Sequence, residues 1–344
     1  MDTAIFLILA QDGVGSGAIY ALLALALVLV FSVTRVIFIP QGEFVAFGAL
    51  SLAALQGGKV PATLWLLLGL GAVVALLECG NRFREADWEG VGGMLGWNLA
   101  YPLLLTGLLY SLDLAGLGMP LQIALTLAIL VPLGPMLYRV AYQPIAETSV
   151  LVLLIASVAV HLVLTGLGLV FFGAEGVRTV AFSEGSVQWG ELAVSKQTLW
   201  VVGSSAAFIV SLYAFFARTI YGKALRATAV NQSGAKLMGI SPVVAGKLTF
   251  LLAALLGVFS GILIGPITTI YYDTGFLIGL KGFVAAIIGG LASYPLAAAG
   301  AVLVGQLESF SSFWASAFKE VLVFTLIIPV LLWRSLTSHH VEEE

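Results

Sequence analysis

Long apolar runs without a single charged residue restrict the fold of this chain more than any other feature. Residues 197–217 form one such run of 21 residues, and residues 248–272 form another of 25. A helix of this length crosses a hydrocarbon layer of about 30 Å. Only 10% of the residues are charged and 60% are hydrophobic, which leaves too little polar surface to cover a water-soluble fold of this size. The sequence therefore predicts an integral membrane protein.

The same runs predict an all-α fold, because a transmembrane β-barrel would show short segments of alternating hydrophobicity instead. We expect a polytopic transmembrane helix bundle with eight to eleven membrane segments, some of them broken or re-entrant. The segment 43–56 is short enough to be a half-helix, and Ser293-Tyr294-Pro295 interrupts the segment 282–307. Residues 1–338 are predicted to form a single transmembrane domain, followed by a polar tail at 339–344. The candidate segments are 13–34, 43–56, 62–77, 90–112, 114–138, 148–172, 197–217, 248–272, 282–307 and 321–333.

The charged connectors predict which side of the membrane each loop occupies. The loop 218–247 carries five of the fifteen Lys and Arg residues and no Asp or Glu. A cationic connector between two spans marks the cytoplasmic side, and the loop around Arg139, two spans earlier, is expected on the same side. The loop 173–196 has three acidic and two basic residues and is expected outside.

The basic loop contains a candidate docking helix. Residues 225–238 are predicted to form a short helix that Gly239 ends. A short helix with an apolar stripe and basic flanks lies on lipid headgroups or fits a groove of a peripheral partner. The residues alone leave both interpretations open. The stripe, within an arc of roughly 100°, consists of Val230, Gly234, Leu237 and Met238.

Residues 38–44, FIPQGEF, interrupt the helical pattern after the first span. Pro40 and Gly42 are expected to break the helix and to leave backbone amides and carbonyls free at membrane depth. Such breaks are tolerated where they line a cavity, and small polar solutes bind there. Gln41 and Glu43 add hydrogen-bonding side chains at the same place. An ordinary turn with a glutamate at a helix start explains the pattern equally well.

Ionisable residues inside apolar segments are costly, and they face a cavity, a partner or water. His161 lies in the middle of a span, where a neutral, hydrogen-bonded core histidine is the favoured interpretation. For Lys281, a structural ion pair or snorkelling to the interface is favoured over a role in a solute path. A stripe of small residues at every fourth position favours a tight helix–helix contact over a role in permeation. It consists of Ala253, Gly257, Gly261 and Gly265.

No motif in the sequence indicates an enzyme. The chain contains no GxxxxGKS/T, HExxH, GxSxG or CxxC, so no catalytic residue, cofactor or metal is predicted. Cys79 is the single cysteine and is expected to be an inert core thiol. One alternative is a stand-alone, ion-coupled secondary transporter, for which Glu43, Asp273 and Glu308 are too scattered to form paired carboxylates. The other is a membrane enzyme or scaffold subunit.

The stretch YGKALRATAVNQSGAKLMGISPVVAGKLTF resembles the coupling region of permease subunits in ABC importers for branched-chain amino acids. That family shows a pattern like GxAxRAxAxNxxxAxLxGI followed by a span containing Thr-Phe. Three more blocks agree, in the family order: GSGAIYALLALALVLVFSVTRVIFIPQGEF, VAYQPIAE and GFLIGLKGFVAAIIGGLASYPLAAAGAVLVGQLESF. Together they cover roughly two thirds of the chain, which is more specific than any single motif. The chain departs from the family at residues 57–137, which are longer, at residues 293–297 and at its C-terminus.

The resemblance implies a permease subunit of an ATP-driven ABC importer for branched-chain amino acids or similar small polar solutes. Such a protein is multi-pass in the bacterial inner (plasma) membrane. The implied partners are cytoplasmic ATP-binding subunits, a second permease subunit, homologous or identical, a periplasmic substrate-binding protein and membrane lipid. No nucleic acid is expected as a partner.

The resemblance also assigns two groups of residues. The loop 218–247 becomes the cytoplasmic coupling loop, in which Arg226 and Asn231 make polar contacts to the ATPase and Leu237 and Met238 are apolar anchors. The expected translocation path offers polar contacts along an otherwise apolar route, through Gln41, Gly42, Glu43 and Lys281. The expected coupling residues are Gly222, Arg226, Ala227, Asn231, Ala235, Leu237, Met238 and Gly239.

Overall fold

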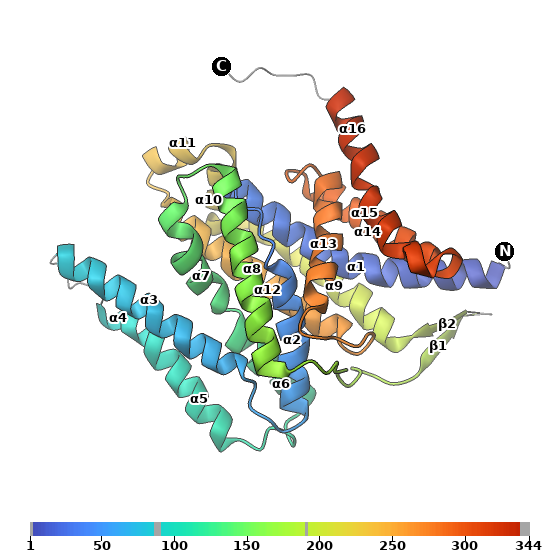
Figure 1. Ribbon diagram of the computed structural model, residues 1–344, viewed down its shortest axis with the longest axis horizontal. Helices are drawn as coiled ribbons and strands as arrows, with labels where there is room; N and C mark the ends of the chain where they lie inside the picture. Colours follow the sequence, from blue (N-terminus) through green and yellow to red (C-terminus); the bar gives the residue numbers. More distant parts are fainter. Residues whose placement is uncertain (1–2, 86–90, 190–191, 338–344) are drawn as a thin grey trace.

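The computed structural model describes residues 3–85, 91–189 and 192–337, and the predicted polar tail at 339–344 lies outside this range. The described chain is a bundle of helices, as the uncharged runs predict (Figure 1). In chain order the α-helices are α1 (Thr3–Thr34), α2 (Gln41–Gln56), α3 (Thr63–Glu85), α4 (Val91–Leu95), α5 (Tyr101–Ser111), α6 (Met119–Leu130), α7 (Leu133–Leu137), α8 (Val150–Phe172), α9 (Lys196–Arg218), α10 (Ile220–Val230), α11 (Gln232–Leu237), α12 (Pro242–Ile264), α13 (Thr274–Ile288), α14 (Tyr294–Trp314), α15 (Lys319–Thr325) and α16 (Ile327–Thr337).

Eight helical stretches among the described residues are long and apolar enough to cross a membrane. This number agrees with the lower end of the predicted range. Two further helices are shorter, α2 with 16 residues and α13 with 15. The predicted interruption near Ser293 separates α13 from α14, and the Ser293 side chain caps the new helix. The eight stretches are Ile5–Thr34, Thr63–Gly80, Met119–Ile145, Val150–Phe172, Lys196–Arg218, Pro242–Ile264, Tyr294–Trp314 and Ser316–Trp333.

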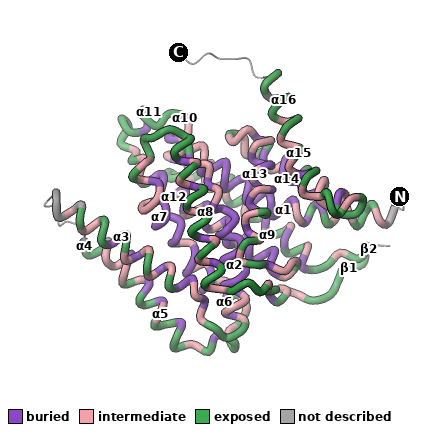
Figure 2. Tube along the Cα trace, viewed as in Figure 1, coloured by how far each residue is buried: buried purple, intermediate pink, exposed green. Residues whose placement is uncertain are grey.

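The centre of the bundle is formed by α1, α2, α12 and α13, where buried residues are concentrated (Figure 2), and α14 packs against α1 and α13 at its side. The small-residue stripe lets α12 lie directly on the backbone of α2. A Cβ atom on Gly261 would lie 2.0 Å from the Val45 carbonyl oxygen, and one on Gly257 would lie 2.8 Å from Gln41 Nε2. Only residues without side chains permit this approach. The predicted tight helix–helix contact is therefore present.

The two ends of the bundle can be told apart by their ion pairs and loops. Arg139 Nε lies 2.9 Å from Glu78 Oε1, and Lys247 Nζ lies 3.4 Å from the same oxygen. The Arg139 loop and the basic loop 218–247 therefore share one end, called the basic end below. Because α8 and α9 each run the length of the bundle, the loop between them lies at the opposite end.

That loop carries a small antiparallel hairpin which the sequence did not lead us to expect. Strand β1 (Ser186–Trp189) pairs with β2 (Leu192–Ser195). The preceding part of the loop is fixed to the bundle by backbone pairing of Val177 with Ile270. We call this the hairpin end (Figure 1).

The long region at 57–137 adds helices at one edge of the molecule. In Figure 1, α3 and α5 lie side by side and diverge from the bundle centre. Gly71 of α3 lies against the π-helical turn Gly96–Ala100 that precedes α5, where a Cβ atom on Gly71 would lie 2.2 Å from the Asn98 carbonyl oxygen. The region α3–α5 therefore lies at the periphery of the bundle, outside the central helices.

Candidate functional site

The basic loop folds into two short helices, so the prediction of one helix over 225–238 was wrong. Helix α10 begins at Ile220, and the Thr219 hydroxyl caps it by accepting a hydrogen bond from Gly222 N at 2.9 Å. The chain then leaves the helical conformation at Asn231 (φ −151°, ψ 101°). Asn231 Oδ1 accepts from Gly234 N at 2.8 Å and starts α11. Asparagine favours this capping position over a helix interior, which explains the break.

Large apolar side chains of this loop are exposed. The exposed fractions of Val230, Leu237 and Met238 are 86%, 89% and 83%. These residues lie outside the candidate spans. An exposed apolar cluster outside the spans is the usual mark of an interaction surface.

An open groove of about 700 Å³ runs between α10 and α11. Arg226, Ala227 and Asn231 are exposed beside it. Gly239 has a φ of +82° and lies directly after Met238, as expected of a residue that ends a helix. The groove is lined by Lys223, Arg226, Ala227, Val230, Asn231, Gly234, Ala235, Met238 and Ile240.

Two of the expected coupling residues are buried rather than displayed. Gly222 lies where a Cβ atom would be 2.3 Å from the Phe215 carbonyl oxygen, so it permits the sharp turn from α9 into α10. Ala235 is also buried. These two positions hold the loop in shape, and the exposed ones form its surface.

The basic loop is anchored to the end of α1. Leu225 on α10 is buried in a cluster with Leu29 and Val33 of α1, together with Phe216 and Ala245. Immediately beyond this contact, α1 ends at Thr34 and the broken segment follows. The basic loop and the broken segment are therefore connected through one helix end.

The broken segment reaches the middle of the bundle. Residues 35–40 are not helical, and α2 begins at Gln41. Gln41 Nε2 donates to the Ala253 carbonyl oxygen at 3.0 Å, halfway along α12. Glu43 Oε1 accepts from His161 Nδ1 at 2.7 Å, halfway along α8. Because α8 and α12 are both membrane spans, α2 begins near the bilayer midplane.

The prediction that both Pro40 and Gly42 break the helix was wrong for Gly42. Pro40 is the last residue before α2, whereas Gly42 lies within the first turn of the helix. A Cβ atom on Gly42 would lie 2.1 Å from the Gly275 carbonyl oxygen, so Gly42 lets α2 touch α13. Glu43 also lies in the first turn, as the simpler explanation of a helix-start glutamate requires.

Polar groups at the start of α2 are deeply buried and only partly satisfied. Gln41 is 0% exposed and Glu43 is 1% exposed. Gln41 Oε1 and Glu43 Oε2 have no hydrogen-bond partner among the described residues. His161 is hydrogen-bonded, as predicted, but its partner lies 118 positions away in the sequence. No local pattern could have revealed that pair.

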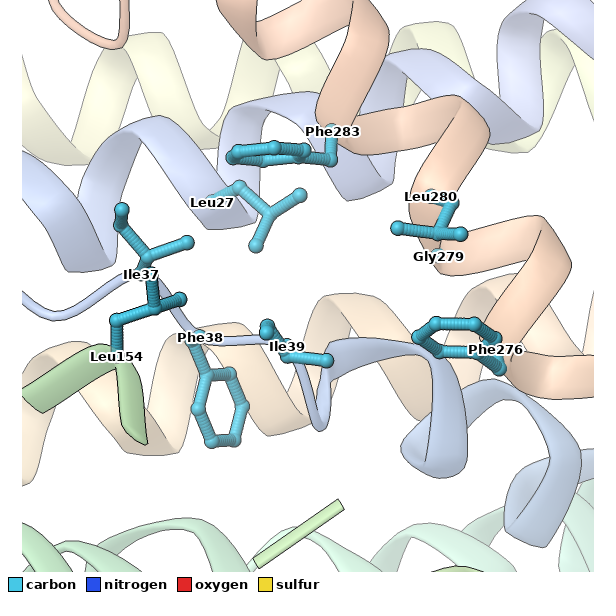
Figure 3. A pocket seen from close by; sticks show the side chains of 9 residues that line it. All are labelled: Leu27, Ile37, Phe38, Ile39, Leu154, Phe276, Gly279, Leu280 and Phe283. Atoms are coloured by element: carbon cyan, nitrogen blue, oxygen red, sulfur yellow. The ribbon is translucent and has the colours of Figure 1, made fainter. Parts of the chain in front are cut away.

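An apolar pocket of about 160 Å³ lies beside this polar cluster, between the broken segment and α13. Figure 3 shows its side chains, which come from four parts of the chain and surround an open space. The Phe276 ring stacks on the His161 ring, with 4.4 Å between the ring centroids. The pocket is lined by Leu27, Ile37, Phe38, Ile39, Leu154, Phe276, Gly279, Leu280 and Phe283.

Lys281 forms the structural ion pair that the sequence favours. Its Nζ atom lies 2.5 Å from Glu308 Oε1 and 3.1 Å from Glu320 Oε1, and the residue is 5% exposed. The Tyr20 hydroxyl also donates to Glu308. This cluster borders a polar cavity of about 480 Å³, whose other polar lining includes Asp12, Ser16, Thr198, Thr268, Thr274 and Lys319.

The expected path residues do not all come together. Gln41, Gly42 and Glu43 form one continuous site at the start of α2. Lys281 lies on the face of α13 that borders the polar cavity, whereas Phe276 and Leu280 line the apolar pocket on the other face. Helix α13 therefore separates Lys281 from the other three residues.

A multi-pass helical bundle with a broken segment at the midplane and an exposed apolar cluster on a basic loop is consistent with a membrane permease. The family described as branched-chain amino acid transport system, permease component, matches residues 90–331. The chain belongs to this family.

Curated relatives extend the match over nearly the whole chain. The high-affinity branched-chain amino acid transport system permease protein LivH of Salmonella typhimurium is 25% identical over 336 residues, covering 93% of this chain and 91% of the relative. LivH of Escherichia coli K12 matches with the same identity and coverage. BraD of Pseudomonas aeruginosa, a permease protein of the same description, is 27% identical over 248 residues, covering 70% and 81% of the two chains. These relatives indicate a transport subunit of the membrane.

Proposed function

We propose that this chain is the permease subunit of an ATP-driven ABC importer for branched-chain amino acids or similar small polar solutes. Family membership and the names of the relatives support the transport role. The proposal that an ATP-binding subunit drives transport rests on the exposed apolar surface of the basic loop, which consists of Val230, Leu237 and Met238. A partner subunit that covers this surface removes it from water.

The proposed partners follow from the two ends of the bundle. Short cationic loops face the cytoplasm, so the basic end would meet two cytoplasmic ATP-binding subunits. The hairpin end would then face the periplasm of a bacterial inner membrane and receive solute from a binding protein. A second permease subunit, homologous or identical, and lipid would cover the apolar sides. The sequence holds no GxxxxGKS/T motif, so the proposal assigns ATP hydrolysis to the partner.

The contacts of α10 suggest how ATPase motion would reach the solute. Leu225 packs on Leu29 and Val33 near the end of α1. From there the chain leads through residues 35–40 to Gln41 and Glu43 at the midplane. A displacement of α10 would move the end of α1 and hence the broken segment. In this proposal Gln41, Gly42 and Glu43 line the translocation path, and Lys281 contributes from the other face of α13.

Charge reversal on the docking loop tests the proposal. Arg226 is exposed beside the groove, so Arg226→Glu should lower uptake of labelled leucine while the amount of permease in the membrane stays unchanged. Lys59→Glu reverses an exposed charge close after the end of α2, away from the docking loop, and should leave uptake at the wild-type rate. If the Arg226→Glu variant takes up leucine at the wild-type rate, Arg226 does not contribute to the contact with the ATP-binding subunit.

A further inference from the structure

We propose that the apolar pocket of Figure 3 and His161 together form a solute-binding subsite that extends from the bilayer midplane toward the basic end. The subsite takes an amphipathic solute, with its branched aliphatic group in the pocket and its polar head on His161. This inference rests on the proposed transport function and assigns its specificity to particular residues. A volume of about 160 Å³ is below the roughly 300–1,000 Å³ of pockets that enclose a whole drug-sized ligand. The pocket therefore suits one apolar group of a solute.

The surroundings of the pocket are unsuited to lipid. Ile37, Phe38 and Ile39 line it, and they belong to the non-helical segment whose backbone is not closed by helical hydrogen bonds. Non-helical backbone at this depth is tolerated where protein covers it or where it lines a cavity. The Glu43–His161 pair lies at the same depth, and charged or polar side chains there mark solute pathways. Two independent features thus place a passage at this face.

Polar and apolar parts of the subsite meet at Phe276. This ring lines the pocket and stacks on the His161 ring. His161 is partly exposed, at 13% of its side chain, and uses Nδ1 for Glu43. Its Nε2 atom makes no hydrogen bond to any described residue. That nitrogen is the hydrogen-bonding group left for the head of the solute.

Glu43 acts through His161 as a positioning residue. It is 1% exposed, so a solute meets the imidazole and not the carboxylate. The hydrogen bond to Nδ1 fixes the orientation of the ring and places the proton on that nitrogen. Oε2 of Glu43 is buried and has no hydrogen-bond partner among the described residues. The subsite therefore combines a fixed polar anchor with an apolar wall.

Leu154 is the pocket residue to test, because α8 supplies a matched control. Leu154 lines the pocket, whereas Leu162 on the same helix is 63% exposed on the outside. Replacing the single native cysteine by Cys79→Ser allows Leu154→Cys and Leu162→Cys to be compared as lone thiols. Both variants are studied in native membranes that contain the complete transporter.

The measurement is the rate of labelling by a small water-soluble methanethiosulfonate, with and without leucine. At ten times its dissociation constant, leucine leaves about one site in eleven empty, so labelling of Leu154→Cys should slow roughly tenfold. Glycine has no side chain to fill the pocket and should protect less. Leu162→Cys should stay unreactive under both conditions, because lipid covers the outside of the bundle and keeps the water-soluble reagent away. A Leu154→Cys thiol that is unreactive, or equally reactive with and without leucine, overturns the subsite.

Solute preference provides a second test. Leu154→Ala enlarges the pocket and should raise phenylalanine uptake relative to leucine uptake, whereas Leu162→Ala should leave the ratio unchanged. Equal ratios in the two variants would contradict the inference. Leucine uptake by the Cys79→Ser parent separates the two levels of the account. A wild-type transporter without leucine uptake refutes the proposed transport of branched-chain amino acids, and a transporting Cys79→Ser parent with an unprotected Leu154→Cys refutes only the subsite.

Discussion

Two buried polar clusters lie on opposite sides of α13, and they satisfy ionisable side chains inside a membrane in different ways. Lys281 is held by two carboxylates, Glu308 and Glu320, beside a polar cavity. Glu43 has one partner, His161, and keeps an unpartnered oxygen beside an apolar pocket. We infer that the two clusters have different roles. The Lys281 cluster fastens helices to one another, and the Glu43 cluster leaves hydrogen-bonding capacity for a solute.

The largest effect should come from Lys281→Met. The substitution leaves Glu308 and Glu320 without their counter-charge, and breaking a buried pair in this way costs about 3–5 kcal/mol. We expect a marked loss of thermal stability in detergent, measured by the fraction of permease that remains monodisperse after heating.

The same variant can reverse the comparison. Should Lys281→Met keep the thermal stability of the wild type and lose leucine uptake, Lys281 would act only in the translocation path and would not hold the helices together. Glu308→Gln added to Lys281→Met removes one of the two unpaired charges and should restore part of the stability.

A smaller effect is expected where α2 touches α13. Gly42→Ala places a methyl group against the Gly275 carbonyl oxygen, 2.1 Å from an ideal Cβ position. Overpacking of this kind costs about 1–3 kcal/mol. Gly69→Ala is the matched control, because a Cβ atom there meets nothing within 4 Å. Equal thermal stabilities of the two variants would show that the contact between α2 and α13 is not tight.

The smallest effect should follow from graded changes at His161. His161→Leu removes the imidazole that hydrogen-bonds to Glu43, so its effect on transport is measured by the KM for leucine. His161→Gln keeps an amide donor for Glu43 and should retain more function. We expect the KM for leucine uptake to rise by about tenfold in His161→Leu, which corresponds to about 1.4 kcal/mol, and by less in His161→Gln. Identical KM values for both variants and the wild type would exclude His161 from solute binding.

The sequence predicts features that arise from neighbouring residues and misses features that arise from distant ones. Uncharged runs predicted the helical spans, and the spacing of Gly257 and Gly261 predicted the contact of α12 with another helix. The partner of Glu43 could not be predicted, because His161 lies 118 positions away. Helix packing alone brings these two residues together.

The other differences between the prediction and the structure concern the basic loop and the hairpin, and they arise from the local preferences of single residues. The apolar stripe on the basic loop indicated one helix, but the preference of Asn231 for capping divides it into α10 and α11. The hairpin of β1 and β2 has no clear alternation in its sequence and was not predicted. A lone acid and a lone histidine, each within an apolar segment, indicate that each needs a partner, but the sequence does not show that they are partners of one another.

Affinity purification of this permease from its native membrane in mild detergent, with the subunits identified by mass, tests the central claim most directly. The account predicts that an ATP-binding subunit co-purifies. It also predicts that Arg226→Glu combined with Leu237→Glu releases this subunit, while Lys59→Glu retains it. A stable assembly without an ATP-binding subunit would contradict the account, and the surface of α10 and α11 would then be a site that lies on lipid headgroups.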